Sequence, residues 1–171
     1  SMGSGHFLVA AIDRIENKLS NWLHNNSVPG INRELQYMKE AALKELGDLS
    51  DGVTIDDSQL LRRMIARKCI FGVDINPITV ELARLSIWIH TFVPGLPLSL
   101  LDHNLIQGNS LVGIESLSQI RKKLKAGEGT LLSLDADKIL RDAAEPLKKL
   151  ARLSDASIKD IQEGRTLIEL A

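Results

Sequence analysis

The sequence Ile70-Phe71-Gly72-Val73-Asp74-Ile75-Asn76-Pro77 decides how the rest of the chain is interpreted. Apolar and small residues lead directly into an acid and a turn, which is a pattern typical of a short buried strand. Residues 78–90 are predicted to form the helix that follows. An acid at the carboxyl end of a parallel strand commonly binds a ribose diol, but an Asp before a helix can also cap that helix. At this point both roles remain open for Asp74.

The composition is that of one globular domain, or of one domain with an attached arm. Of the 171 residues 44% are hydrophobic and only 4% are aromatic, which favours an aliphatic, helix-rich core. The net charge of −1 does not indicate a free-standing, basic DNA-binding domain. The single cysteine, Cys69, excludes an internal disulfide and fits a reducing cytoplasm. We expect Cys69 to be a small buried residue at the start of the strand.

The sequence predicts neither a membrane span nor a metal site. The most apolar run, residues 86–101, contains His90, Pro94 and Pro97, which interrupt it before it reaches the length of a span. The histidines show no metal-ligand spacing with cysteine or acidic residues.

An amphipathic helix is predicted immediately after Gly3-Ser4-Gly5. Glycines before a helix allow backbone N–H groups to approach a ligand closely. Because Leu8 stands where the fingerprint Gly-x-Gly-x-x-Gly has its third glycine, the motif is incomplete, and a flexible chain end explains two glycines equally well. The apolar residues of the helix recur at intervals of three and four and are expected on one face: Phe7, Leu8, Ala11, Ile12, Ile15, Leu19 and Trp22.

Two further helices are predicted over residues 32–46 and 59–68, the first with Asn32 as its N-cap and Gly47 as its stop. The helix over residues 78–90 is apolar nearly all round, so it is expected to be well buried. The basic residues of the 59–68 helix are expected to form a solvated face, with phosphate binding as the alternative: Arg62, Arg63, Arg67 and Lys68.

A second strand is predicted over residues 104–107, and it ends in the turn Gly108-Asn109-Ser110-Leu111-Val112-Gly113. Asn109 would present its amide to a base edge there, although an ordinary turn uses the same residue types. Beyond residue 114 the sequence is rich in helix formers. A helix over residues 134–153 is expected to be kinked or divided by Pro146, and Ser154 or Asp155 to cap a last helix.

Three features therefore follow one another: a glycine loop opening a helix, an acid ending a strand, and an Asn-Ser turn ending the next strand. A nucleoside ligand needs such parts, with loop amides at its charged end, a carboxylate on its ribose hydroxyls and a polar group at its purine. Hydrogen bonds to a charged acceptor contribute about 1.5–3 kcal/mol each, so Asp74 is expected to dominate the binding of the sugar.

This arrangement resembles the S-adenosylmethionine site of class I methyltransferases, and more closely that of type IIG-like N6-adenine DNA methyltransferases of restriction-modification systems. The resemblance implies that Gly3 and Gly5 line the methionine end of the cofactor, with Ser4 beside them. It also implies that Asp74 binds the ribose next to Ile75, and that Asn109 lies near the adenine. The resemblance covers about residues 2–113 and is carried by five stretches: residues 2–8, residues 72–77 with 80–83, residues 91–98, residues 101–103 and residues 108–113.

From this resemblance we expect an α/β fold: a helix-rich, partial Rossmann-like methyltransferase fold with an incomplete sheet and a C-terminal helical arm. Residues 1–113 would form the part that binds S-adenosylmethionine, with a helical insertion at about residues 25–58. Residues 114–171 would form the helical arm.

The catalytic tetrad of that family, Asn-Pro-Pro followed by an aromatic residue, occurs nowhere in these 171 residues. We therefore expect a cofactor-binding fragment without catalytic residues, inactive alone, whose parent protein acts on DNA in the cytoplasm. Apolar surface left by truncation would favour self-association. The main alternative is a helical interaction or dimerisation module with a vestigial nucleotide-binding fold. A nicotinamide-dependent dehydrogenase is disfavoured by Leu8 and by the lack of an obvious proton-transfer pair.

Overall fold

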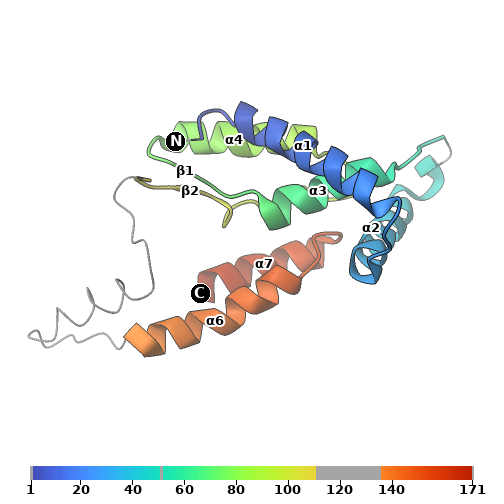
Figure 1. The fold of residues 1–171 in the computed structure, drawn as a ribbon. Coiled ribbons are helices and arrows are strands. Elements are labelled where there is room, and N and C mark those ends of the chain that lie inside the picture. Colours follow the sequence, from blue (N-terminus) through green and yellow to red (C-terminus); the bar gives the residue numbers. More distant parts are fainter. Residues whose placement is uncertain (1, 51, 111–135, 171) are drawn as a thin grey trace, which may run out of the picture.

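The computed structural model describes residues 2–50, 52–110 and 136–170, most of which are helical (Figure 1). In chain order the elements are α1 (His6–Leu23), α2 (Pro29–Leu46), the 3₁₀ helix η1 (Gly47–Ser50), α3 (Asp57–Cys69), β1 (Gly72–Asp74), α4 (Pro77–His90), β2 (Leu105–Gln107), α6 (Ala136–Arg152) and α7 (Ile158–Leu170). The prediction of a helix-rich chain with two short strands is confirmed. The predicted boundary at residues 113–114 and the turn residues 111–113 lie outside the described residues.

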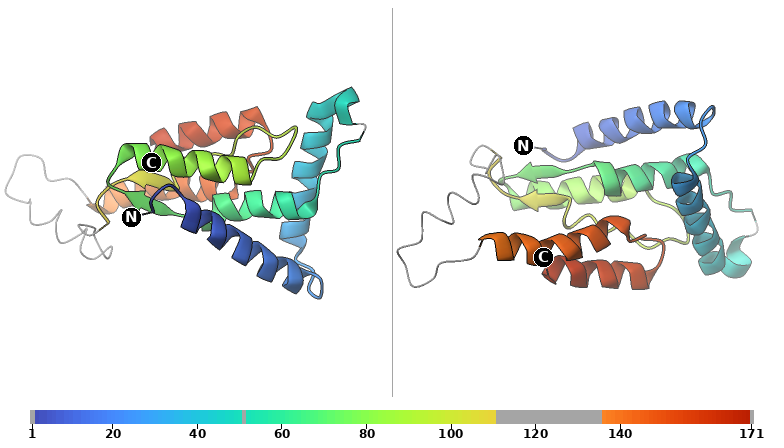
Figure 2. Two further views of the ribbon diagram at one scale, coloured as in Figure 1. Left: turned by 90° about the horizontal axis from the view of Figure 1, so that it is seen from above. Right: turned by 60° about the horizontal axis from the view of Figure 1, so that its bottom comes forward.

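The elements form three layers (Figures 1 and 2). Helices α1 and α4 lie on one side of a middle layer that contains β1, β2 and α3, and the hairpin of α6 and α7 lies on the other side. Helix α2 runs across the ends of α1 and α3 (Figure 2). The middle layer is therefore covered on both faces.

Strands β1 and β2 are parallel and pair Gly72 with Leu105 and Asp74 with Gln107. Two further hydrogen bonds extend the pairing, from the Gly72 N–H to the Asn104 carbonyl (2.8 Å) and from the Gly108 N–H to the Asp74 carbonyl (2.9 Å). Parallel strands need a crossover connection, which α4 and the loop after it provide. Within the described residues this is a two-stranded sheet, and its two carboxyl ends meet at one edge.

Helix α3 is the centre of the main hydrophobic core. Its apolar side chains are buried because α1 and α2 pack against it: Leu60, Leu61, Met64, Ile65 and Ala66. A second, smaller cluster joins Leu100 to Leu150 of α6 and Leu167 of α7. The hairpin is therefore attached to the rest of the molecule partly through Leu100.

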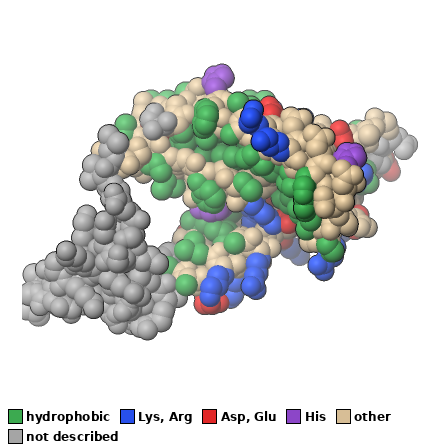
Figure 3. Space-filling view, in the orientation of Figure 1, with side chains coloured by type: hydrophobic (Ala, Val, Ile, Leu, Met, Phe, Trp, Pro, Cys, Tyr) green, Lys and Arg blue, Asp and Glu red, His purple; other side chains and the backbone are tan. Residues whose placement is uncertain are grey.

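Helix α4 is less buried than its sequence predicts. Only Val80, Ala83 and Ile87 are buried, because the helix contacts α1 and the two strands along a single face. Four other apolar side chains of α4 and Phe92, two residues beyond its end, form an exposed stripe, here called the α4 stripe: Ile78, Leu82, Leu85, Ile89 and Phe92. On α1 likewise, Phe7, Ile15 and Trp22 are exposed although we expected them on the buried face. Hydrophobic side chains accordingly reach the surface in the layer above the hairpin (Figure 3).

The expectation of a solvated basic face on α3 is wrong for two of its residues. Arg63 and Arg67 are buried and both face Asp155, which lies between α6 and α7. The sequence pattern missed this because the compensating carboxylate is more than eighty residues away along the chain. Burial lowers the pKa of Arg63 and the Asp155 carboxylate raises it again, and a guanidinium stays charged in either case.

Three local predictions are also corrected. Cys69 is the exposed last residue of α3 and does not begin the strand. Helix α2 begins at Pro29, whose fixed φ suits a first helical turn, so Asn32 lies inside the helix and is not its cap. Pro146 does not divide its helix, because it lies inside α6, which is a single helix over its described length; whether it kinks α6 stays a prediction.

The start of α7 likewise differs from the prediction. Ser157 caps it by accepting a hydrogen bond from the Asp160 N–H at 3.2 Å, while the Ser157 N–H donates to the Asp160 carboxylate at 3.0 Å. This reciprocal pair is a capping box, and it leaves Asp155 to pair with the arginines.

None of the described helices combines the length and the apolar character needed to cross a membrane.

We predict that Asp155→Asn lowers the free energy of unfolding by about 3–5 kcal/mol, because it leaves two buried guanidinium groups without a counterion. Urea unfolding followed by circular dichroism measures the change. The exposed Glu163→Gln on α7 removes a charge without a buried partner and should change the free energy by less than about 0.5 kcal/mol. A loss below about 1 kcal/mol for Asp155→Asn would contradict this account of the hairpin.

Candidate functional site

Asp74 lies at the carboxyl end of β1 and binds the N-terminal loop. Its Oδ2 atom accepts hydrogen bonds from the backbone N–H groups of Met2 (3.0 Å) and Gly3 (3.1 Å), and its Oδ1 atom accepts one from the Asn76 N–H (3.0 Å). The residue is 5% exposed. A buried carboxylate needs such donors to compensate for lost hydration, so the loop and the strand end stabilise each other.

Asp74 is not the N-cap of the next helix, which was the alternative left open by its sequence. That position belongs to Asn76, whose side-chain oxygen accepts a hydrogen bond from the Ile78 N–H at 3.0 Å. The carboxylate therefore binds the glycine loop through Oδ2 and the N-cap residue of α4 through Oδ1.

The glycine loop is also attached to α4. The Ser86 hydroxyl donates to the Ser4 carbonyl at 2.9 Å. Gly5 packs so closely on α4 that an added Cβ would stand 3.0 Å from the Ala83 Cα. Gly3 and Gly5 both have positive φ values, 57° and 89°, a region that other residues occupy only with strain. Glycine is thus required at position 5 for two reasons, conformation and space.

The N-terminus of α1 begins at this loop without a side-chain cap. Gly5 is its N-cap residue, no side chain among the described residues accepts a hydrogen bond from the first turn, and the first turn carries no acidic residue. Unpaired N–H groups at a helix N-terminus attract a negatively charged ligand group. The uncapped start of α1 and the Asp74 carboxylate therefore lie on either side of one short loop.

Asn109 follows β2 at the same edge of the sheet, two residues after Gln107, which pairs with Asp74. Asn109 is exposed to solvent. Ile75 follows Asp74 directly, and its side chain is 66% exposed. The structure thus brings Gly3 and Asp74 into direct contact and places Ile75 and Asn109 at the same sheet edge, with Ser4 in the adjoining loop.

The sequence did not reveal the groups that position Asp74. They are the backbone N–H groups of Met2 and Asn76, together with the Ser86 hydroxyl that holds the loop. Backbone donors leave no trace in residue type, and a serine in an apolar helix is common. No group of three or more possible metal ligands occurs among the described residues.

His103 lies at the opposite end of the strands, just before β2. Burial lowers its pKa, as does the positive charge of Arg67, while Asp102 raises it by less. Its Nδ1 atom is buried and has no hydrogen-bond partner among the described residues. The neutral ring is therefore favoured in the folded chain.

Comparison with known families gives a match over the second part of the chain. The model of the Eco57I restriction-modification methylase family matches residues 68–166, which is more than half of the chain. The matched range includes Asp74, Asn109, α6 and part of α7, and it begins after the glycine loop. No curated protein and no solved structure matches this chain.

We predict that Gly5→Ala is more destabilising than Gly3→Ala. Both substitutions place a side chain at positive φ, which costs about 1–2 kcal/mol, but only the alanine at position 5 also collides with α4. We expect a total loss of roughly 2–5 kcal/mol for Gly5→Ala, since overpacking adds about 1–3 kcal/mol. Urea unfolding of both variants tests this, and equal losses would show that the contact with Ala83 is unimportant.

We also predict that His103 lowers stability in acid. Its folded-state pKa lies below the ordinary value of 6.5, so as the pH falls through about 6.5 the unfolded chain binds a proton before the folded chain does. The free energy of unfolding should therefore fall between pH 7 and pH 5.5, and less so in His103→Gln. Denaturation curves at several pH values measure this, with the exposed His6→Gln as control. Parallel pH profiles of the chain and His103→Gln would contradict it.

Proposed function

The chain belongs to the Eco57I restriction-modification methylase family, and we propose that it is the S-adenosylmethionine-binding part of a type IIG-like, adenine-specific DNA N6-methyltransferase. Membership of the family supports a methyltransferase-related function. The observation that carries the finer proposal is the hydrogen bonding of Asp74 to the glycine loop at the carboxyl edge of a parallel sheet. In open α/β sheets this edge is where nucleotide ligands bind.

The residue types at this edge suit the chemical groups of S-adenosylmethionine. The carboxylate of its methionine end would face the uncapped N–H groups at the start of α1, beside Gly3, Ser4 and Gly5. Asp74 would accept hydrogen bonds from the ribose hydroxyls. A carboxylate offers about four acceptor sites, and two hydrogen bonds already reach Oδ2 from Met2 and Gly3. The sugar would therefore share or replace the loop N–H groups, which couples cofactor binding to the position of the loop.

The adenine of the cofactor would lie between the two strand ends. The exposed side chain of Ile75 offers an apolar surface for a flat base, and Asn109 carries an amide that can donate to and accept from a base edge. Ile75 comes directly after β1 and Asn109 two residues after β2, so the sheet register largely sets their spacing. This part of the proposal depends on the strands keeping that register.

S-adenosylmethionine supplies the methyl group, carried on a sulfonium, while the residues named here bind and orient it. Holding the target adenine is a separate task, because a base inside a duplex must be flipped out before it can react. The tetrad that performs this task in the resembling family does not occur in the 171 residues. We therefore propose that DNA binding and methyl transfer depend on other parts of a parent protein acting in the cytoplasm, and that this chain alone is inactive.

The division into a cofactor-binding part, residues 1–113 with its insertion at about 25–58, and a helical arm, residues 114–171, remains part of this proposal. A second candidate function is a helical interaction module, favoured by the exposed α4 stripe. Exposed apolar surface of this kind also favours self-association. A monomeric sedimentation profile at high concentration would count against both ideas.

We predict that Asp74→Asn weakens S-adenosylmethionine binding by about 10- to 100-fold, the loss expected for charged hydrogen bonds of about 1.5–3 kcal/mol. Isothermal titration calorimetry measures the affinity, and urea unfolding checks that the variant is folded. Asp102→Asn, at a half-exposed carboxylate that pairs with Arg84, is the matched control and should bind normally. A folded Asp74→Asn variant with unchanged affinity would exclude the proposed ribose contact.

A further inference from the structure

Two buried arginines of α3 share a single carboxylate. Arg63, Arg67 and Asp155 are 2%, 5% and 3% exposed. Arg63 Nη2 lies 3.1 Å from Asp155 Oδ2, whereas Arg67 Nη1 lies 3.8 Å from Asp155 Oδ1. The Ser99 hydroxyl also donates to this carboxylate, which is therefore engaged mainly by Arg63 and Ser99. The cluster carries one more positive than negative charge, and the excess lies on Arg67.

The guanidinium of Arg67 is incompletely hydrogen-bonded. Its Nη2 atom donates to the Leu150 carbonyl at 3.4 Å. Its Nη1 atom is buried and donates no hydrogen bond to any described residue. A buried charged donor without an acceptor is costly, because water has been removed and nothing replaces it. An anion placed against Nη1 would supply both the missing acceptor and the missing negative charge.

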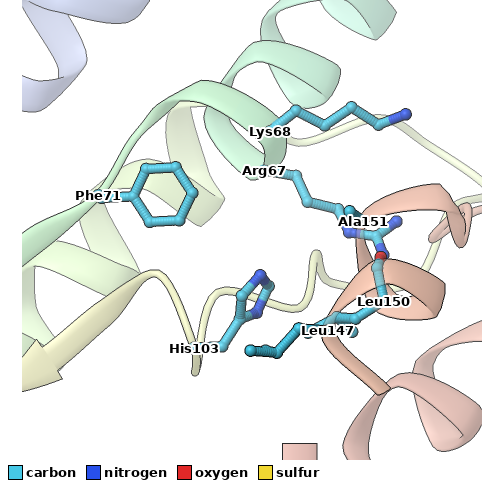
Figure 4. Close-up of a pocket in the computed structure, with 7 residues that line it drawn as sticks. All are labelled: Arg67, Lys68, Phe71, His103, Leu147, Leu150 and Ala151. Carbon is cyan, nitrogen blue, oxygen red and sulfur yellow. The ribbon is translucent and has the colours of Figure 1, made fainter. Parts of the chain in front are cut away.

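A cavity of about 310 Å³ lies beside this guanidinium (Figure 4). His103 contributes a second polar group, because its buried Nδ1 atom also has no partner among the described residues. Lys68 lines the cavity only with its stem, since its ammonium group pairs with Glu34. The remaining walls are apolar: Phe71, Leu147, Leu150 and Ala151. The side chains of Phe71 and Leu147 are partly exposed, so the cavity is open to solvent.

The cavity and the proposed cofactor site lie at opposite ends of the parallel strands. Phe71 and His103 precede β1 and β2, whereas Asp74 and Asn109 lie at or beyond their carboxyl ends. The α6–α7 hairpin, through Leu147 and Leu150, forms one wall of the cavity. A ligand in the cavity would therefore contact both the hairpin and the middle layer, and its binding is independent of the proposed function.

We propose that this cavity binds a small organic anion, a carboxylate or phosphate monoester, whose oxyanion contacts Arg67 and whose apolar body packs on Phe71 and Leu147. A guanidinium offers a planar pair of donors that matches both oxyanions. The volume lies at the lower end of the range for small-molecule sites, about 300–1,000 Å³. A purely apolar ligand would fill the space but leave the charge of Arg67 unbalanced.

Nuclear magnetic resonance of the ¹⁵N-labelled 171-residue chain tests the proposal with three probes: benzoate, phenyl phosphate and benzyl alcohol. We expect at least one of the two anions to produce saturable amide shifts in residues 67–71, 103–104 and 147–151. Benzyl alcohol, which carries a similar ring without the charge, should bind about tenfold more weakly or worse. The relative affinities of benzoate and phenyl phosphate distinguish a carboxylate ligand from a phosphate ligand.

The key variant is Arg67→Met, which removes the charge, keeps an apolar stem and leaves Asp155 paired one-to-one with Arg63. We expect it to fold and to bind the anionic probe about tenfold more weakly or worse. Arg62→Met is the matched control, because Arg62 lies on the same helix, pairs with Asp13 and Glu16, and does not line the cavity. The Arg62→Met variant should bind the anionic probe with the same affinity as the unaltered chain.

Leu147→Glu provides a second test that does not depend on Arg67. Leu147 is half-exposed, so the substitution is compatible with folding, and the new carboxylate would repel an anion in the cavity. We expect a loss of anion affinity of about tenfold. The proposal is overturned if neither anion binds, if benzyl alcohol binds as tightly as the anions, or if Leu147→Glu and a folded Arg67→Met both bind the anion normally.

Discussion

The hydrogen bonds between the Asp74 carboxylate and the N-terminal loop connect most of the features that make this chain a candidate cofactor-binding protein. They join the end of β1 to residues 2 and 3, and thereby place the start of α1 at the carboxyl edge of the sheet. The loop in turn reaches α4 through Ser4 and Gly5. Because the carboxylate is buried, these donors are needed for stability as well as for position. A ligand that binds Asp74 must therefore act on the loop too.

The other end of the same strands has the opposite electrostatic character. There, two buried guanidinium groups surround a single carboxylate that comes from the hairpin. A histidine whose pKa is lowered by burial and by the charge of Arg67 lies at the same end. Asp155 holds the hairpin to α3 but leaves Arg67 only partly neutralised. The carboxyl end of the small sheet thus carries an anionic side chain bound by backbone N–H groups. The other end carries cationic side chains beside an apolar cavity.

Much of the secondary structure was predictable because local sequence determines it. The strand ending at Asp74, the second strand, and the stop of α2 at Gly47 all occur as their residue types predict. The predicted faces of helices were less accurate. Helix α4 was expected to be buried all round, but its stripe from Ile78 to Phe92 is exposed, and Arg63 and Arg67 were expected at the surface but are buried. Both errors concern what packs against a helix, and periodicity alone carries no information about that.

The sequence alone therefore determined most of the helices and strands, and it placed an acid, a glycine loop and an asparagine at the element ends that form the proposed cofactor site. It determined these features because propensity, capping and turn geometry act within a few residues. Only the tertiary structure decided that Asp74 binds the N-terminal loop and that Asp155 neutralises arginines of α3. Those contacts join groups far apart in the chain, or use backbone atoms common to every residue, so no local pattern can specify them.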